Sequence, residues 1–143
     1  MEKMNDAQYN EMYSILKLQK NELYVIGAKV MQSVYCGGND ISNEGFMENN
    51  SCEFHALFYG FSVKLMDIAV RIDKALSFLK EAKYYQLKRV LAEAVFIVDV
   101  LAESLKDDKV ILGRGVNVAR DVEKLSTSLT LAIRYIVMNV EGI

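Results

Sequence analysis

The stretch NSCEFHALFYGFSVKLMDIAVRIDKALSFLKE, from Asn50 to Glu81, predicts one long helix. Its apolar residues recur at alternating spacings of four and three, which is typical of a helix packed along its length against other helices. A second apolar row follows the same spacing on nearly the opposite face. A helix that is apolar on most of its circumference must be surrounded by its own chain or by a partner. The first row consists of Phe54, Phe58, Phe61, Leu65, Ile68, Ile72, Ala75 and Leu79, and the second of Tyr59, Val63, Met66 and Val70.

The rest of the chain supplies helices with a matching pattern. We expect helices over about 6–35 and 83–107, and a last helix that ends near Val140, each with one apolar row. No segment alternates as a strand would, so the sequence predicts an all-α fold, an antiparallel four-helix bundle, in a single domain over residues 1–143. Gln19 lies in register with the apolar row of the expected helix over 6–35, which consists of Met12, Leu16, Leu23, Ile26 and Val30. It is either a satisfied or partly exposed amide or a buried polar group that sets the register. Gly27 is expected to let a neighbouring helix approach closely.

Glycine, asparagine and acidic residues interrupt the helical pattern from Cys36 to Ser51. We expect a long acidic loop over 36–51, although connections in helical bundles usually take only about two to eight residues. Asn50, with Glu53 three residues later, predicts a capping box that opens the second helix. Loops of this length are often functional or disordered.

Composition narrows the class of protein. Apolar residues make up 52% of the chain, somewhat high for a small soluble protein, and a subunit interface is one place to hide the excess. No apolar run approaches the roughly 20 residues that span a bilayer. The polar start lacks the core of a signal peptide, so we expect a cytoplasmic protein whose two cysteines are free thiols. The net charge of −2 gives no global electrostatic argument for nucleic-acid binding.

Three residues have the types and the spacing of metal ligands. Cys36, Cys52 and His55 would converge if the first two helices are antiparallel neighbours. A structural zinc site usually takes four ligands, and no fourth is evident, so small thiols and a helix-start histidine are the simpler interpretation. A disulfide between the two cysteines is a further alternative.

Catalytic motifs are missing from the sequence. The single histidine leaves no repeated Glu-x-x-His motif and no partner for a nucleophilic serine. Asp67 and Arg71, four residues apart, are expected to form an ordinary helix ion pair. We therefore predict no enzyme, no cofactor and no metal.

Basic and aromatic residues gather at one end of the predicted bundle. The segment 80–89 holds four basic residues and one acid, with two tyrosines between them. This combination is typical of a surface for nucleic acid. The alternative is a solvated helix end whose tyrosines pack on the bundle. The residues concerned are Lys80, Lys83, Tyr84, Tyr85, Lys88 and Arg89.

The order of elements from Ser51 onward also carries a resemblance. A long helix is followed by the short Lys83-Tyr84-Tyr85 turn, an Ala/Leu-rich helix and a last helix with ARDVEKL at 119–125 and IRYI at 133–136. This arrangement resembles the accessory variability family of diversity-generating retroelements, which is related to the four-helix proteins encoded by intervening sequences in ribosomal RNA genes. The resemblance implies a bundle that forms barrel-like pentamers and associates with a reverse transcriptase and its RNA template.

Six apolar residues cannot share the core with the main rows, and we predict that they form an interface in a closed homo-oligomer. The leading hypothesis is a non-catalytic, self-associating scaffold or adaptor that docks a protein partner, which the resemblance would make a reverse transcriptase with its RNA. The alternative is a small regulatory protein, of the antitoxin or anti-defence type, that acts through protein contacts of the acidic loop. The predicted interface residues are Tyr59, Val63, Met66 and Val70, with Phe96 and Val100, which interrupt a charged stripe on the third helix.

Overall fold

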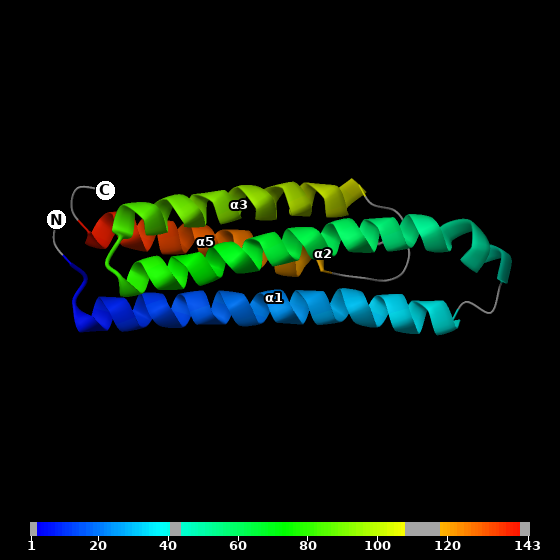
Figure 1. The fold of residues 1–143 in the computed structure, drawn as a ribbon, viewed down its shortest axis with the longest axis horizontal. Coiled ribbons are helices and arrows are strands. Elements are labelled where there is room, and N and C mark those ends of the chain that lie inside the picture. Colours follow the sequence, from blue (N-terminus) through cyan, green and yellow to red (C-terminus); the bar gives the residue numbers. More distant parts are fainter. Residues whose placement is uncertain (1–2, 41–43, 108–117, 141–143) are drawn as a thin grey trace.

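The computed structural model describes residues 3–40, 44–107 and 118–140, with side chains in 3–30, 59–105 and 118–140. Its helices are α1 (Asp6–Asp40), α2 (Glu44–Lys80), α3 (Tyr84–Asp107) and α5 (Ala119–Asn139). α1 contacts α2 and α5, and α3 contacts the same two helices, so α1 and α3 lie diagonally across the bundle (Figure 1). The predicted all-α, antiparallel four-helix bundle is confirmed.

The helices differ in length. α1 and α2 hold 35 and 37 residues, whereas α3 and α5 hold 24 and 21. At a rise of 1.5 Å per residue the longest helix spans about 55 Å. α1 and α2 therefore extend past the other two helices at one end of the bundle, as Figure 1 shows. None of the helices in the described ranges is long and apolar enough to cross a membrane.

The prediction of a loop over residues 36–51 is wrong for most of that range. α1 continues to Asp40 and α2 already begins at Glu44, so Asn50 lies inside a helix and does not cap one. Glycine and asparagine lower helix propensity by no more than about 1 kcal/mol per residue. A helix that is already formed gains one backbone hydrogen bond for each residue it adds, and this gain outweighs so weak a preference.

The buried core follows the predicted apolar rows at nearly every position whose side chain is described. Ile68 and Ile72 of α2 are 0% exposed, whereas Leu65 is only half-buried because it lines a groove towards α1. Full burial of one large apolar side chain contributes about 1.5–3 kcal/mol, so these rows hold the helices together. The other helices bury Met12, Leu16, Leu23, Ile26 and Val30 in α1, Leu87, Leu91, Ala94, Val98, Leu101 and Leu105 in α3, and Val122, Leu125, Leu129, Ala132 and Ile136 in α5. Phe54 and Phe58 lie outside the residues whose side chains are described.

A reciprocal pair of hydrogen bonds fixes the start of α1. The backbone N–H of Gln8 donates to Asn5 Oδ1 at 2.8 Å, and the backbone N–H of Asn5 donates to Gln8 Oε1 at 2.9 Å. This is a capping box, which satisfies backbone donors that the first turn of a helix leaves free. Gln8 Nε2 also donates to Asn139 Oδ1 at 3.1 Å, so the start of α1 is tied to the end of α5.

α2 ends in a Schellman motif. The backbone N–H of Lys83 donates to the carbonyl of Phe78 at 2.9 Å, and that of Ala82 donates to Leu79 at 3.1 Å. The motif needs a left-handed residue at the position of Ala82, whose φ is 59°. Alanine adopts this conformation at some cost because its Cβ crowds the backbone, and the short turn into α3 follows directly.

The structure resolves the two questions left open on α1. Gln19 is the buried polar group: it is 0% exposed, and its Nε2 donates to Ser128 Oγ of α5 at 3.0 Å. The prediction that Gly27 allows an unusually close approach is wrong. A Cβ at Gly27 would lie 3.7 Å from Leu65 Cδ1, an ordinary contact distance, because the two helices leave a groove at this level.

Candidate interaction surfaces

The outward face of α2 carries an exposed apolar row. Tyr59 is 72% exposed and Met66 is 67% exposed, whereas Ile68 on the inward face is fully buried. Val63 and Val70 continue the row at about half exposure. A helix of this bundle buries one face only, so the second row found in the sequence is left to solvent in the single chain.

α3 presents a second exposed apolar feature. Phe96 is 71% exposed, and Val100, one turn further on, is also exposed. Acidic residues lie beside them, because Asp99 and Glu103 line the same shallow hollow as Phe96. Asp99 is held by Ser126 of α5, whose hydroxyl donates to Asp99 Oδ1 at 2.6 Å. The aromatic ring therefore stands out from a polar surround, as the anchor residues of protein interfaces often do.

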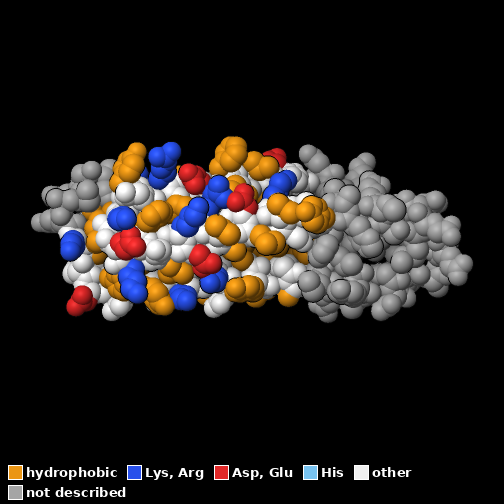
Figure 2. Space-filling model, viewed as in Figure 1, with side chains coloured by type: hydrophobic (Ala, Val, Ile, Leu, Met, Phe, Trp, Pro, Cys, Tyr) orange, Lys and Arg blue, Asp and Glu red, His pale blue; other side chains and the backbone are white. Residues whose placement is uncertain are grey.

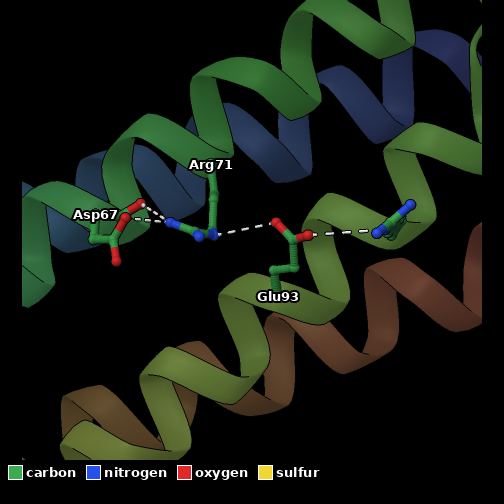
Figure 3. Close-up of polar contacts among 4 residues, drawn as sticks. Asp67, Arg71 and Glu93 are labelled. Atoms are coloured by element: carbon green, nitrogen blue, oxygen red, sulfur yellow. Dashed lines mark hydrogen bonds and ion pairs between the residues drawn. The ribbon is translucent and has the colours of Figure 1, made fainter.

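An ion-pair chain crosses from α2 to α3 (Figure 3). Arg71 pairs with Asp67 one turn earlier, as predicted, and its Nε lies 3.3 Å from Glu93 Oε2. Glu93 Oε1 in turn lies 3.9 Å from Arg89 Nε. Exposed pairs of this kind contribute at most about 1 kcal/mol each, but they place charge between the two helices. In Figure 2 the apolar side chains on this face are accordingly interspersed with basic and acidic ones.

A groove of about 340 Å³ lies between α1 and α2. Most of its lining is apolar or small, and Gly27 of α1 faces Leu65 of α2 within it. Its charged lining residue is Lys20, whose Nζ donates to Asp73 Oδ1 at 2.7 Å. The hydrogen bond and the charge of Asp73 raise the pKa of Lys20 above its ordinary value of 10.5. The apolar and small lining residues are Leu23, Tyr24, Gly27, Ala28, Ser62, Leu65, Met66 and Ala69.

The basic segment at the turn between α2 and α3 divides into buried and exposed residues. Tyr84 is only 5% exposed, and its hydroxyl accepts a hydrogen bond from the backbone N–H of Met4 at 2.9 Å. Tyr85 is 55% exposed, with Lys88 Nζ 5.7 Å from its ring centre. Lys83 pairs with Glu81 at 3.0 Å. Tyr84 is therefore part of the buried core, and Tyr85 is the tyrosine of this segment that is accessible to a ligand.

Lys80 and Arg89 are the remaining basic residues of that segment, and both are exposed. Arg89 takes part in the ion-pair chain through Glu93, so its charge is already partly compensated. Nucleic-acid contact by this segment stays a prediction that rests on its lysines and Tyr85.

Glu22 lies in a second groove, between α1 and α5, with a volume of about 300 Å³. Its Oε2 is covered and has no hydrogen-bond partner in the described part of the chain. Burial raises the pKa of Glu22 above its ordinary value of 4.5, and the nearby charge of Asp121 raises it further, while Lys124 opposes the shift. Asp121 is itself paired with Lys29 at 2.8 Å. The ionised form of Glu22 is therefore disfavoured in the folded protein.

The metal-like set of Cys36, Cys52 and His55 lies outside the residues whose side chains the structure describes. Among the side chains that are described, no group of three or more histidines, cysteines or acids could hold a metal ion. The prediction that the chain binds no metal stays a prediction.

Sequence reasoning missed the groove between α1 and α2. The signal for it was weak: Gly27 of α1 and Ala69 of α2 are small residues on facing helices, and their pairing is not visible before the register of the helices is known. Comparison of the chain with protein-family models, with curated proteins and with solved structures gives no match.

Proposed function

We propose that this protein is a non-catalytic, self-associating helical scaffold that docks a protein partner. The observation that carries the proposal is the two-sided character of α2. On one side Ile68, Ile72 and Ala75 are 0% exposed, and on the other Tyr59 and Met66 are more than 65% exposed. Apolar side chains are costly to leave in water, and repeated exposure along one helix is typical of an interaction surface.

The chemistry of the exposed residues supports docking. Methionine adapts its shape to a partner, and tyrosine offers a large rigid surface at low entropic cost. The α2 row combines both types with two valines, and the neighbouring groove adds Tyr24 of α1 at 66% exposure. Self-association through such surfaces would remove apolar area from water in every subunit, since closed symmetry leaves none uncovered.

The resemblance supplies the kind of partner. In the accessory variability family the bundle associates with a reverse transcriptase and its RNA template, and we propose the same partner class for this chain. The exposed lysines near Tyr85, in the segment 80–89, are the part of the described surface where RNA would be met.

Light scattering on matched variants tests the proposal. The wild type should be an oligomer, and the double variant Val63→Glu with Phe96→Glu should be a monomer with unchanged helical circular dichroism, because both positions are exposed. Met138→Glu is the control, since Met138 is 83% exposed on α5, away from both features. A monomeric wild type would rule out self-association. An oligomer that survives the double change would place the interface elsewhere.

A further inference from the structure

The groove between α1 and α2 has the length of two helical turns. Its lining residues lie within 20–28 on α1 and within 62–69 on α2. At a rise of about 1.5 Å per residue these stretches measure about 10–12 Å. Apolar side chains at positions i, i+4 and i+7 of a docked helix span about 10.5 Å. The groove can therefore take three such side chains along its length.

The lining of the groove suits a helix better than an extended peptide. Its small residues would let a third helix lie close to α1 and α2, in the valley between them. A helix satisfies its own backbone N–H and C=O groups, whereas an extended peptide would need polar partners that a mostly apolar lining does not supply. Tyr24 and Met66, which are 66% and 67% exposed, offer apolar surface on the two sides of the groove. The small lining residues are Gly27, Ala28, Ser62 and Ala69.

One end of the groove carries uncompensated positive charge. Lys20 and Asp73 pair at 2.7 Å, so their charges cancel, and the pair marks the same end of the groove on both helices. Lys17, one turn before Lys20, is exposed, with its Nζ 5.6 Å from the ring centre of Tyr13. Lys74 directly follows Asp73 and is exposed too. Neither Lys17 nor Lys74 forms an ion pair within the described residues, so this end favours a partner with acidic residues.

A second copy of this chain matches the groove less well. Phe96 and Val100 of α3 lie beside acidic residues, but they are one turn apart and would fill only about half of the groove. Leu131 and Met138 of α5 are exposed and two turns apart, but the exposed residue Arg134 between them is basic. A helix that combines apolar residues over two turns with acidic residues at one end meets both conditions.

From these observations we infer that the α1–α2 groove takes an amphipathic helix of the partner protein. This helix carries apolar side chains at i, i+4 and i+7, and its acidic residues lie at the end that meets Lys17 and Lys74. The inference rests on the proposed docking of a protein partner and specifies the chemistry of that partner.

Fluorescence anisotropy with stapled helical peptides of about 15 residues tests the inference. The first peptide has leucines at i, i+4 and i+7 and glutamates in its first turn. The second peptide has lysine in place of each glutamate, and the third has serine in place of each leucine. The wild type should bind the first peptide at least about tenfold more tightly than the other two.

Two glycines provide matched variants for the groove. Gly27→Leu fills the groove, and it should fold because a Cβ at Gly27 would lie at an ordinary contact distance of 3.7 Å from Leu65 Cδ1. This variant should bind the first peptide at least about tenfold more weakly than the wild type. Gly60→Leu is the control, because a Cβ at Gly60 of α2 would meet nothing within 4 Å and Gly60 does not line the groove. It should bind as the wild type does, and circular dichroism would verify that both variants are folded.

Charge reversal tests the acidic end of the partner helix. The double variant Lys17→Glu with Lys74→Glu should bind the lysine peptide more tightly than the glutamate peptide, the reverse of the wild type. Arg134→Glu is the matched control, since Arg134 is exposed on α5 and does not line the groove. An unchanged preference in the double variant would overturn the assignment of an acidic partner.

The other outcomes separate this inference from the proposed self-association. A wild-type oligomer that binds none of the peptides, or whose binding survives Gly27→Leu, overturns the groove as the docking site and leaves self-association standing. A monomeric wild type that binds the first peptide with the expected preferences does the opposite. An oligomer that dissociates in Gly27→Leu would assign the groove to a second copy, and binding of oligouridine that is lost in Gly27→Leu would assign it to nucleic acid. Either result overturns the inference.

Discussion

Replacing Gln19 with leucine should stabilise this protein. Gln19 is 0% exposed, and its Oε1 has no hydrogen-bond partner among the described residues. A buried acceptor without a partner costs about 1–3 kcal/mol, whereas a typical hydrogen bond such as that from Nε2 to Ser128 Oγ, at 3.0 Å, contributes about 0.5–1.5 kcal/mol. Leucine at this position removes the cost of the buried acceptor and loses the hydrogen bond to Ser128. The half-buried Ser128 hydroxyl keeps access to water. The expected net gain in free energy of unfolding is about 1 kcal/mol.

Urea unfolding followed by circular dichroism measures this difference. The urea concentration at the midpoint of unfolding should rise. The slope of the free energy of unfolding against urea concentration should stay the same, because the surface exposed on unfolding hardly changes. Ser128→Ala is the matched control: it leaves the amide of Gln19 without its acceptor and should lower stability by about 1–2 kcal/mol. A lower midpoint for Gln19→Leu with the same slope would refute the reasoning, since it would mean that Oε1 has a partner in solution.

Three further predictions concern the helix ends and Glu22. Asn5→Ala should lower the free energy of unfolding by about 1 kcal/mol because it removes the capping box; an unchanged melting temperature would contradict this. Ala82→Gly should raise the free energy of unfolding by about 0.5–1 kcal/mol, because glycine tolerates the φ of 59°. Thermal unfolding at lower temperature would show that the turn needs the alanine side chain. Glu22→Gln should raise the melting temperature at pH 7 and have little effect at pH 3. The raised pKa of Glu22 means that its charged form destabilises the fold only above its ordinary value of 4.5. An equal change in melting temperature at both pH values would mean that Glu22→Gln acts through packing and not through charge.

The core could be predicted because helical periodicity reports burial directly. Ile68 and Ile72 lie on the row that the spacing marked as inward, while Tyr59 and Met66 lie on the row that it marked as surplus. The same argument identified Phe96 as exposed on α3. Periodicity identifies the side of a helix that faces the core without any knowledge of its neighbours.

Features that depend on contacts between distant residues could not be predicted. Tyr84 is buried, and its hydroxyl accepts a hydrogen bond from the backbone N–H of Met4, eighty residues away. The groove beside Gly27 depends on the spacing and register of α1 against α2. The helical ends at Asp40 and Glu44 were missed because glycine and asparagine are only weak helix breakers.

Sedimentation equilibrium of the wild type over a hundredfold range of concentration, about 1 to 100 µM, tests the central claim most directly. Subunit contact through the exposed row of α2 and through Phe96 predicts a mass that is a whole-number multiple of 16.2 kDa at the upper concentrations. A mass of 16.2 kDa at every concentration would contradict self-association, and with it the scaffold proposed for these surfaces.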